Sequence, residues 1–183
     1  MRVITGTARG RRLKTTEGLD TRPTTDKVKE SIFNIIQFDV EGRRVLDLFA
    51  GSGQMGIEAL SRGAEHSTFV ELRRDAAAVV RENLSACKLE EQGTVKQMDA
   101  LAFLQSCREK YDLVFLDPPY DGKLLDQALN LVTLIDIVSG HGIIICEISS
   151  ERKRPELTVP YFIAKEYKYG KTTILRIERS TKE

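Results

Sequence analysis

The chain has 183 residues, of which 41% are hydrophobic and 30% are charged, and its formal net charge is +1. This composition is typical of one globular domain, and no apolar run approaches the roughly 18 residues that a membrane-spanning helix needs. The N-terminus lacks the apolar stretch of a secretory signal, so we expect a cytoplasmic protein with no membrane partner. Three scattered cysteines and two histidines argue against a disulfide framework and against a metal site.

The first fifteen residues carry five cations and no acid. Two short β-like runs, at 2–5 and 12–15, flank the stretch 6–10 and predict a basic β-hairpin extension within residues 1–20. Such a cluster can bind nucleic-acid phosphates, although a solvated tail is the commoner fate of a short charge run. Residues 21–183 then form the main fold of a single domain, beginning with a helix over 26–38 for which Thr24 or Thr25 is a suitable N-cap.

From residue 43 onward, β-rich runs alternate with helical patterns. The β-rich runs lie at 44–49, 67–72, 94–98, 112–116 and 142–148, and the helical patterns lie near 54–62, 73–87, 100–108 and 122–137. This alternation predicts βαβ units and an α/β fold with a parallel sheet. The last two β-like runs, at 161–169 and 172–178, are separated by two residues, which is too short for a crossover, so they form an antiparallel hairpin.

A glycine-rich loop follows the first of these β-rich runs. Asp47 precedes Gly51 and Gly53, and a helical pattern begins directly afterwards. Ligands of open α/β sheets bind beyond the carboxyl ends of the strands, which is where this loop lies. With Gly56 the loop also satisfies the dinucleotide pattern Gly-x-Gly-x-x-Gly, and Glu71 lies where an acid would bind ribose hydroxyls. The loop by itself therefore fits either a nicotinamide dinucleotide or S-adenosylmethionine.

Two features favour S-adenosylmethionine, with S-adenosylhomocysteine as its product. The carboxylate of Asp47 would repel a pyrophosphate but attract a sulfonium or ammonium group. In addition, 183 residues leave no second domain to orient a hydride donor or acceptor. Asp99, after the third β-rich run, could accept a hydrogen bond from an adenine amino group, and it could also cap the helix that follows.

The tetrapeptide Asp117-Pro118-Pro119-Tyr120 follows the β-rich run 112–116. The prolines hold Asp117 in an extended conformation on a stiff backbone. Its carboxylate and nearby carbonyls could hold the N–H groups of an exocyclic amine, and its charge would stabilise the positive charge that develops on nitrogen during methyl transfer. A flipped base could stack on Tyr120, which would return about 1–3 kcal/mol of the flipping cost. Alone, the tetrapeptide is equally consistent with a rigid turn.

Together these motifs resemble the RsmD family, bacterial methyltransferases that use S-adenosylmethionine and act on guanine N2 in 16S rRNA. The likeness is carried by residues 1–6, 9–11, 22–34, 47–53, 117–120 and 169–173. It implies a Rossmann-like class I methyltransferase fold with a seven-stranded sheet whose last strand is antiparallel. It also implies that the substrate is 16S rRNA within the small ribosomal subunit or its assembly intermediate, and we expect a monomer.

The resemblance assigns roles to individual positions. It gives the target base and catalysis to Asp117, Pro118 and Tyr120, with Pro119 in the same rigid tetrapeptide. It gives cofactor binding to Arg22, Pro23, Thr24, Asp47, Phe49, Gly51, Gly53, Glu71, Asp99 and Ala100. Beside such a site, the cationic residues Arg9, Arg11, Arg12 and Lys14 are expected to contact RNA phosphates.

Other functions remain open from the residues themselves. Many adenine methyltransferases have Asn where this chain has Asp117, but either base offers an amino group with two donors, so adenine N6 is an alternative target. A small NAD-dependent oxidoreductase is a second alternative, because of the glycine pattern and Glu71. A non-catalytic RNA-binding module is a third.

Overall fold

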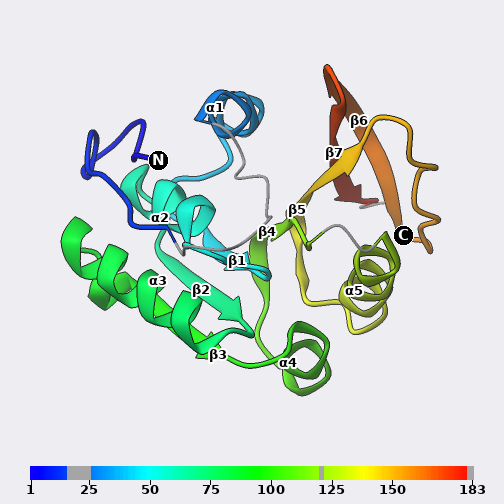
Figure 1. The fold of residues 1–183 in the computed structure, drawn as a ribbon. Coiled ribbons are helices and arrows are strands. Elements are labelled where there is room, and N and C mark those ends of the chain that lie inside the picture. Colours follow the sequence, from blue (N-terminus) through cyan, green and yellow to red (C-terminus); the bar gives the residue numbers. More distant parts are fainter. Residues whose placement is uncertain (16–25, 120–121, 181–183) are drawn as a thin grey trace.

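The computed structural model describes residues 1–15, 26–119 and 122–180 (Figure 1). Its strands are β1 (Arg44–Asp47), β2 (His66–Glu71), β3 (Gly93–Gln97), β4 (Tyr111–Leu116), β5 (Val138–Ser149), β6 (Tyr161–Tyr169) and β7 (Thr172–Arg179). They form one seven-stranded sheet in the order β3-β2-β1-β4-β5-β7-β6. Strands β1 to β5 pair in parallel, whereas β7 is antiparallel to both of its neighbours. The predicted mostly parallel sheet with an antiparallel C-terminal hairpin is confirmed.

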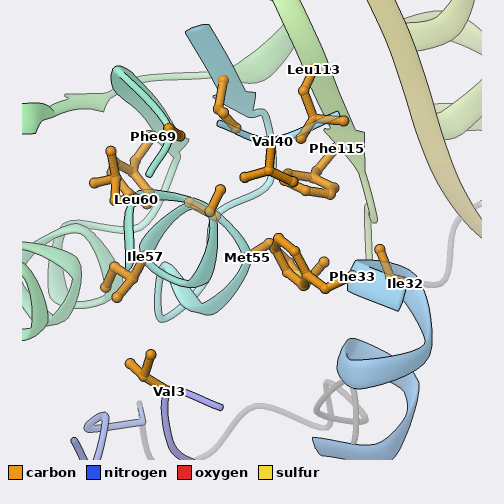
Figure 2. Packing of buried hydrophobic residues seen from close by; sticks show 14 of the residues in the cluster. Val3, Ile32, Phe33, Val40, Met55, Ile57, Leu60, Phe69, Leu113 and Phe115 are labelled. Atoms are coloured by element: carbon orange, nitrogen blue, oxygen red, sulfur yellow. The ribbon is translucent and has the colours of Figure 1, made fainter. Parts of the chain in front are cut away.

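Helices cover both faces of this sheet. They are α1 (Asp26–Ile35), α2 (Gln54–Ser61), α3 (Arg74–Cys87), α4 (Ala100–Ser106) and α5 (Gly122–Leu134), with a short 3-10 turn at Glu90–Gln92. Alternate residues of β4 show the two layers. Leu113 and Phe115 join a cluster with residues of α1 and α2 (Figure 2) and also of α3. Val114 and Leu116 pack instead with α4 and α5. Strand side chains alternate between faces, so each face contributes to its own core.

Helix α5 and strand β5 differ most from their predicted bounds. The helix ends at Leu134 and the strand begins at Val138. The sequence pattern predicts a helix that continues to about residue 137 and a strand that begins at residue 142. Asp136 has a φ of 52°, a left-handed conformation that ends the helix. Its carboxylate accepts a hydrogen bond from the Tyr161 hydroxyl at 2.8 Å. A contact with β6, distant in sequence, therefore helps to set this boundary.

The N-terminal segment, residues 1–15, is attached to α2 instead of forming the two predicted strands. Arg2 and Arg12 form one antiparallel bridge, and backbone hydrogen bonds also join Val3 to Arg11 and Gly10, and Leu13 to Met1. The backbone N–H groups of Ile4 and Thr5 donate to the carboxylate of Glu58 on α2, at 2.8 and 3.0 Å. Because these N–H groups bind a helix side chain, they are not available for a cross-strand ladder. The predicted hairpin is thus present as a short antiparallel pairing of residues 1–3 with residues 10–13, and its turn lies against the helix.

A buried ion pair connects this segment to α1 and α2. Lys29 and Glu58 have fully buried side chains, with 3.7 Å between Nζ and Oε2. Lys29 Nζ also donates to the carbonyl of Arg2, and Arg62 Nε donates to Glu58 Oε1 at 2.8 Å. Burial lowers the pKa of Lys29, while the charge of Glu58 opposes that change. These bonds hold the N-terminal segment, α1 and α2 as one unit.

Two further observations concern the described residues. No helix in ranges 1–15, 26–119 and 122–180 is both long and apolar enough to cross a membrane. The three cysteines, Cys87, Cys107 and Cys146, are free thiols, and all are buried in the two cores.

Candidate active site

Four acidic side chains gather at the carboxyl edge of the sheet. In the strand register, Asp47 of β1 lies opposite Phe69 of β2 and Phe115 of β4. Glu71 and Asp117 each follow those partners by two residues, and Asp99 comes two residues after the end of β3. Neighbouring strands lie about 4.8 Å apart, so these acids form a row across adjacent strands. The structure thereby brings together acids that are up to 70 residues apart in the sequence.

The glycine loop is bonded directly to this row. Gly51 and Gly53 have φ angles of 54° and 78°, a left-handed conformation that glycine adopts at little cost. The N–H of Gly51 donates to Glu71 Oε2 at 2.8 Å, and the N–H of Arg73 donates to Glu71 Oε1 at 2.9 Å. Each carboxylate oxygen has two lone pairs, so Glu71 keeps acceptor capacity for a ligand hydroxyl. Its binding of ribose hydroxyls stays a prediction.

Helix α2 packs closely on the sheet because of Gly56. A Cβ at this position would lie 2.3 Å from the ring of Phe69, a distance that no real contact shows. The same residue's N–H donates to Asp47 Oδ2 at 3.0 Å. The third glycine of the pattern therefore serves helix–sheet packing and holds the Asp47 carboxyl group in place.

Asp47 occupies an environment that disfavours its negative charge. Its side chain is only 4% exposed. Burial raises its pKa to about 7, the charges of Asp117 and Glu71 add to the increase, and the Gly56 N–H opposes it. An edge so rich in negative charge suits a cationic ligand with hydrogen-bond donors and would repel a pyrophosphate. These carboxylate acceptors therefore fit S-adenosylmethionine and disfavour the nicotinamide alternative.

The remaining predicted cofactor residues follow β1 and β3. Asp99 Oδ1 accepts a hydrogen bond from the N–H of Ala102 at 2.9 Å, which confirms it as the N-cap of α4. Its contact with adenine stays a prediction. Ala100 is buried beside it, and the half-buried Phe49 packs against the core on the α4 and α5 face. Arg22, Pro23 and Thr24 lie outside the described residues, as does the predicted N-cap at Thr24 or Thr25.

The proline tetrapeptide begins directly after the last residue of β4. Asp117 is exposed, Pro118 is half-buried and Pro119 is exposed, while Tyr120 lies outside the described residues. The negative charge of Asp117 contributes to the raised pKa of Asp47. It also contributes to the raised pKa of the Cys146 thiol, for which burial is the main cause. Its carboxylate therefore lies between the ends of β1 and β5, at the predicted ligand crevice.

The basic residues of the N-terminal segment lie on the surface. Arg9, Arg11 and Arg12 are exposed. Lys14 is also exposed, but its Nζ pairs with Glu82 on α3 at 2.6 Å, so its charge is partly neutralised. The cationic surface that can meet RNA phosphates is thus carried mainly by the three arginines.

Asn83 on α3 is a site residue that the sequence analysis missed. Its side-chain amide donates to the carbonyl of Ser52 in the glycine loop at 2.9 Å and to the carbonyl of Lys14 at 3.0 Å. Its Oδ1 accepts from the N–H of Lys14 at 2.8 Å. A polar residue at a core-facing position of a helix, between Val80 and Cys87, was the available signal. Asn83 joins the N-terminal segment to the glycine loop.

No group of three or more His, Cys, Asp or Glu side chains is arranged to hold a metal ion in the part of the chain that the structure describes.

Comparisons with known proteins agree with this geometry. A family described as conserved hypothetical protein 95 matches residues 1–178. YlbH of Bacillus subtilis, provisionally named an rRNA methyltransferase, is 42% identical over 177 residues, which cover 95% of this chain and 96% of YlbH. Ribosomal RNA small subunit methyltransferase D of Haemophilus influenzae is 37% identical over 161 residues, covering 86% and 82% of the two chains. The solved structure of Escherichia coli yhhF, provisionally named a methyltransferase, matches with a TM-score of 0.90 at 29% identity, covering 100% and 99%.

Proposed function

Because the chain belongs to the RsmD family of ribosomal RNA small subunit methyltransferases, we propose that it methylates the exocyclic N2 amino group of a specific guanine in 16S rRNA. Membership makes the chain an S-adenosylmethionine-dependent rRNA methyltransferase. The choice of guanine N2 is the proposal. The choice of base rests on the similarity of nearly the whole chain to the RsmD family, and the observation that supports methyl transfer to an amine is the row of Asp47, Glu71 and Asp117 at one edge of the sheet.

When bound, S-adenosylmethionine supplies a methyl group on a positively charged sulfur. Glu71 would accept hydrogen bonds from the ribose, and Asp99 would accept one from the adenine amino group. Gly51 and Gly53 allow the backbone to approach a ligand without a Cβ in the way. Asp47 would bring negative charge to the cationic end of the molecule, and this charge favours the ligand over a neutral or anionic one.

Asp117 acts on the amine that receives the methyl group. Its carboxylate accepts an N–H of the amino group, which favours the tetrahedral geometry that nitrogen needs for attack, and its charge stabilises the cation that develops there. When the new C–N bond forms and the sulfur–methyl bond breaks, the nitrogen becomes an ammonium. That ammonium then loses one proton to Asp117 or to water. Pro118 and Pro119 keep the carboxylate in place, and Tyr120 supplies a face on which the flipped base stacks.

The RNA partner would approach from the side of the N-terminal segment. Arg9, Arg11 and Arg12 would contact phosphates, which gives affinity but no sequence specificity. Their segment is bonded to the glycine loop through Asn83, so phosphate contacts would orient the substrate relative to the cofactor. The small ribosomal subunit or its assembly intermediate, in the cytoplasm, is the proposed substrate, and a monomer suffices for this arrangement.

A transfer assay tests the proposal. The protein is mixed with methyl-labelled S-adenosylmethionine and small-subunit particles that lack the modification, and the rRNA is digested for mass spectrometry. We expect label in N2-methylguanine at one position. Label in N6-methyladenine would favour the adenine alternative, and no label beside an active control enzyme would reject both.

Replacing Asp117 tests the role of its carboxylate. We expect Asp117→Ala to abolish transfer while the dissociation constant for S-adenosylmethionine stays within a few-fold of wild type. The control is Glu65→Ala, which removes an exposed acid before β2, at the opposite edge of the sheet. Retained turnover in Asp117→Ala would remove this residue from the mechanism.

A further inference from the structure

A fifth acid, Glu147 near the end of β5, lies beside Asp117. In the register of β4 and β5, Leu116 is opposite Cys146, so the next residues along the two strands are Asp117 and Glu147. Neighbouring strands are about 4.8 Å apart, which puts the two residues within reach of a single base. Glu147 is half-buried, and neither its sequence pattern nor the proposed function gives it a role.

Both acids belong to the same face of the sheet. Ile143 and Ile145 of β5 pack in the core with α1, α2 and α3, as Phe115 of β4 does. Side chains along an extended chain alternate, so Glu147, two residues beyond Ile145, faces the same way. Asp117, two residues beyond Phe115, does so too, because the proline that follows it favours an extended backbone.

The C-terminal hairpin holds Glu147 in place. Thr172 Oγ1 donates to Glu147 Oε1 at 3.4 Å, and Thr172 itself is buried. The adjacent Thr173 shares a hydrogen bond of 2.9 Å with the hydroxyl of Ser150, just after β5. Residues 169–173, which carry part of the family resemblance, therefore support the end of β5 next to the tetrapeptide.

We propose that Glu147 recognises the target base as guanine by accepting its N1–H, while Asp117 binds the neighbouring N2 amino group. This inference rests on the proposed function and deepens it. Guanine presents these two donors side by side on its Watson–Crick edge, which is the edge that enzymes read on a flipped base. Adenine presents an unprotonated N1 instead, whose lone pair would face a carboxylate and be repelled. Two adjacent carboxylates thus select guanine, which Asp117 alone cannot do.

The expected effect follows from losing one hydrogen bond to a charged group. Such a bond contributes enough to change a rate by about 10- to 100-fold. Glu147→Ala should therefore lower kcat/KM for the guanine substrate by that factor. It should leave the dissociation constant for S-adenosylmethionine unchanged, because Glu147 is separated from the glycine loop by β4. Glu147→Gln keeps one acceptor oxygen, so its kcat/KM for the guanine substrate should lie between the values of wild type and Glu147→Ala.

The experiment compares two substrates with two enzymes. Small-subunit particles are reconstituted with rRNA that carries either guanine or 2-aminopurine at the target position. 2-Aminopurine keeps the C2 amino group but has no N1–H, and its missing O6 affects every enzyme variant alike. We expect wild type to prefer guanine by about 10- to 100-fold, and Glu147→Ala to methylate both substrates at the lower rate. Glu65→Ala serves as the control and should keep the wild-type preference.

The outcomes separate this inference from the proposed function. If wild type methylates guanine N2 but Glu147→Ala slows both substrates by the same factor, Glu147 is only structural and the inference fails alone. An unchanged guanine rate in Glu147→Ala refutes it as well. If wild type labels no guanine in the particles, the proposed function fails, and the assignment of Glu147 fails with it.

Discussion

Replacing Asp47 with asparagine measures the cost of burying a carboxyl group in the acidic edge. In the folded protein its pKa is about 7, against an ordinary value of 3.8. At a pH between these two values, Asp47 is protonated in the folded protein but ionised in the unfolded chain. The free energy of unfolding therefore decreases as pH rises from about 4 to about 7, and this contribution levels off above pH 7. The full contribution is about 4 kcal/mol.

Asparagine is neutral at every pH, and its Oδ1 can still accept the N–H of Gly56. Asp47→Asn should therefore be more stable than wild type by about 2 kcal/mol at pH 5 and by about 4 kcal/mol at pH 8. Urea unfolding of the cofactor-free protein, followed by circular dichroism across this range, gives both curves. Glu65→Gln, at an exposed site, should reproduce the wild-type pH profile.

The same substitution should weaken the binding of S-adenosylmethionine, because it removes negative charge from the site of a cationic ligand. Calorimetry at pH 8 measures this directly. Two results would refute the reasoning: unfolding curves of wild type and Asp47→Asn that stay parallel from pH 5 to 8, or a variant that is less stable than wild type at pH 8.

Glu58→Ala leaves the buried Lys29 without its carboxylate, so we expect a loss of about 3–5 kcal/mol in urea unfolding; an unchanged midpoint would show that the pair is not needed. Gly56→Ala places a methyl group 2.3 Å from the ring of Phe69 and should cost about 1–3 kcal/mol in thermal unfolding. Gly140→Ala, with no atom within 4 Å of its new Cβ, is the comparison and should be far milder. Changing Arg9, Arg11 and Arg12 to alanine should reduce the slope of log Kd for RNA against log salt by up to about 2, since each single-strand phosphate contact contributes about 0.7. An unaltered slope would exclude them from the interface.

The sheet and the position of the site could be predicted because both depend on local signals. Alternating β-rich and helical patterns indicate parallel strands, and a two-residue connection permits only an antiparallel pair. The carboxyl ends of parallel strands share one edge, so residues that follow strands, such as Asp47 and Asp117, were expected to meet there. In the structure Asp117 follows Phe115, the strand partner of Asp47, by two residues, and its charge raises the pKa of Asp47, which agrees with that expectation.

The parts that the sequence did not reveal depend on contacts between distant segments. The N–H groups of Ile4 and Thr5 bind Glu58, more than fifty residues away, and no local pattern indicates this partner. Lys29 looks like a surface residue of α1, yet it is fully buried because Glu58 and the carbonyl of Arg2 surround its ammonium group. Asn83 likewise receives its role only when the chain has folded.

The attachment of the N-terminal segment also sets the order in which the protein can mature during its synthesis. Glu58, which accepts the hydrogen bonds of Ile4 and Thr5, is translated 53 to 54 residues after them. Asn83, which accepts the hydrogen bond of the Lys14 N–H, is translated 69 residues after Lys14. The N-terminal segment can thus obtain these native bonds only after α2 and α3 have been made, and a nascent chain halted before α2 would carry its arginines on an unanchored segment.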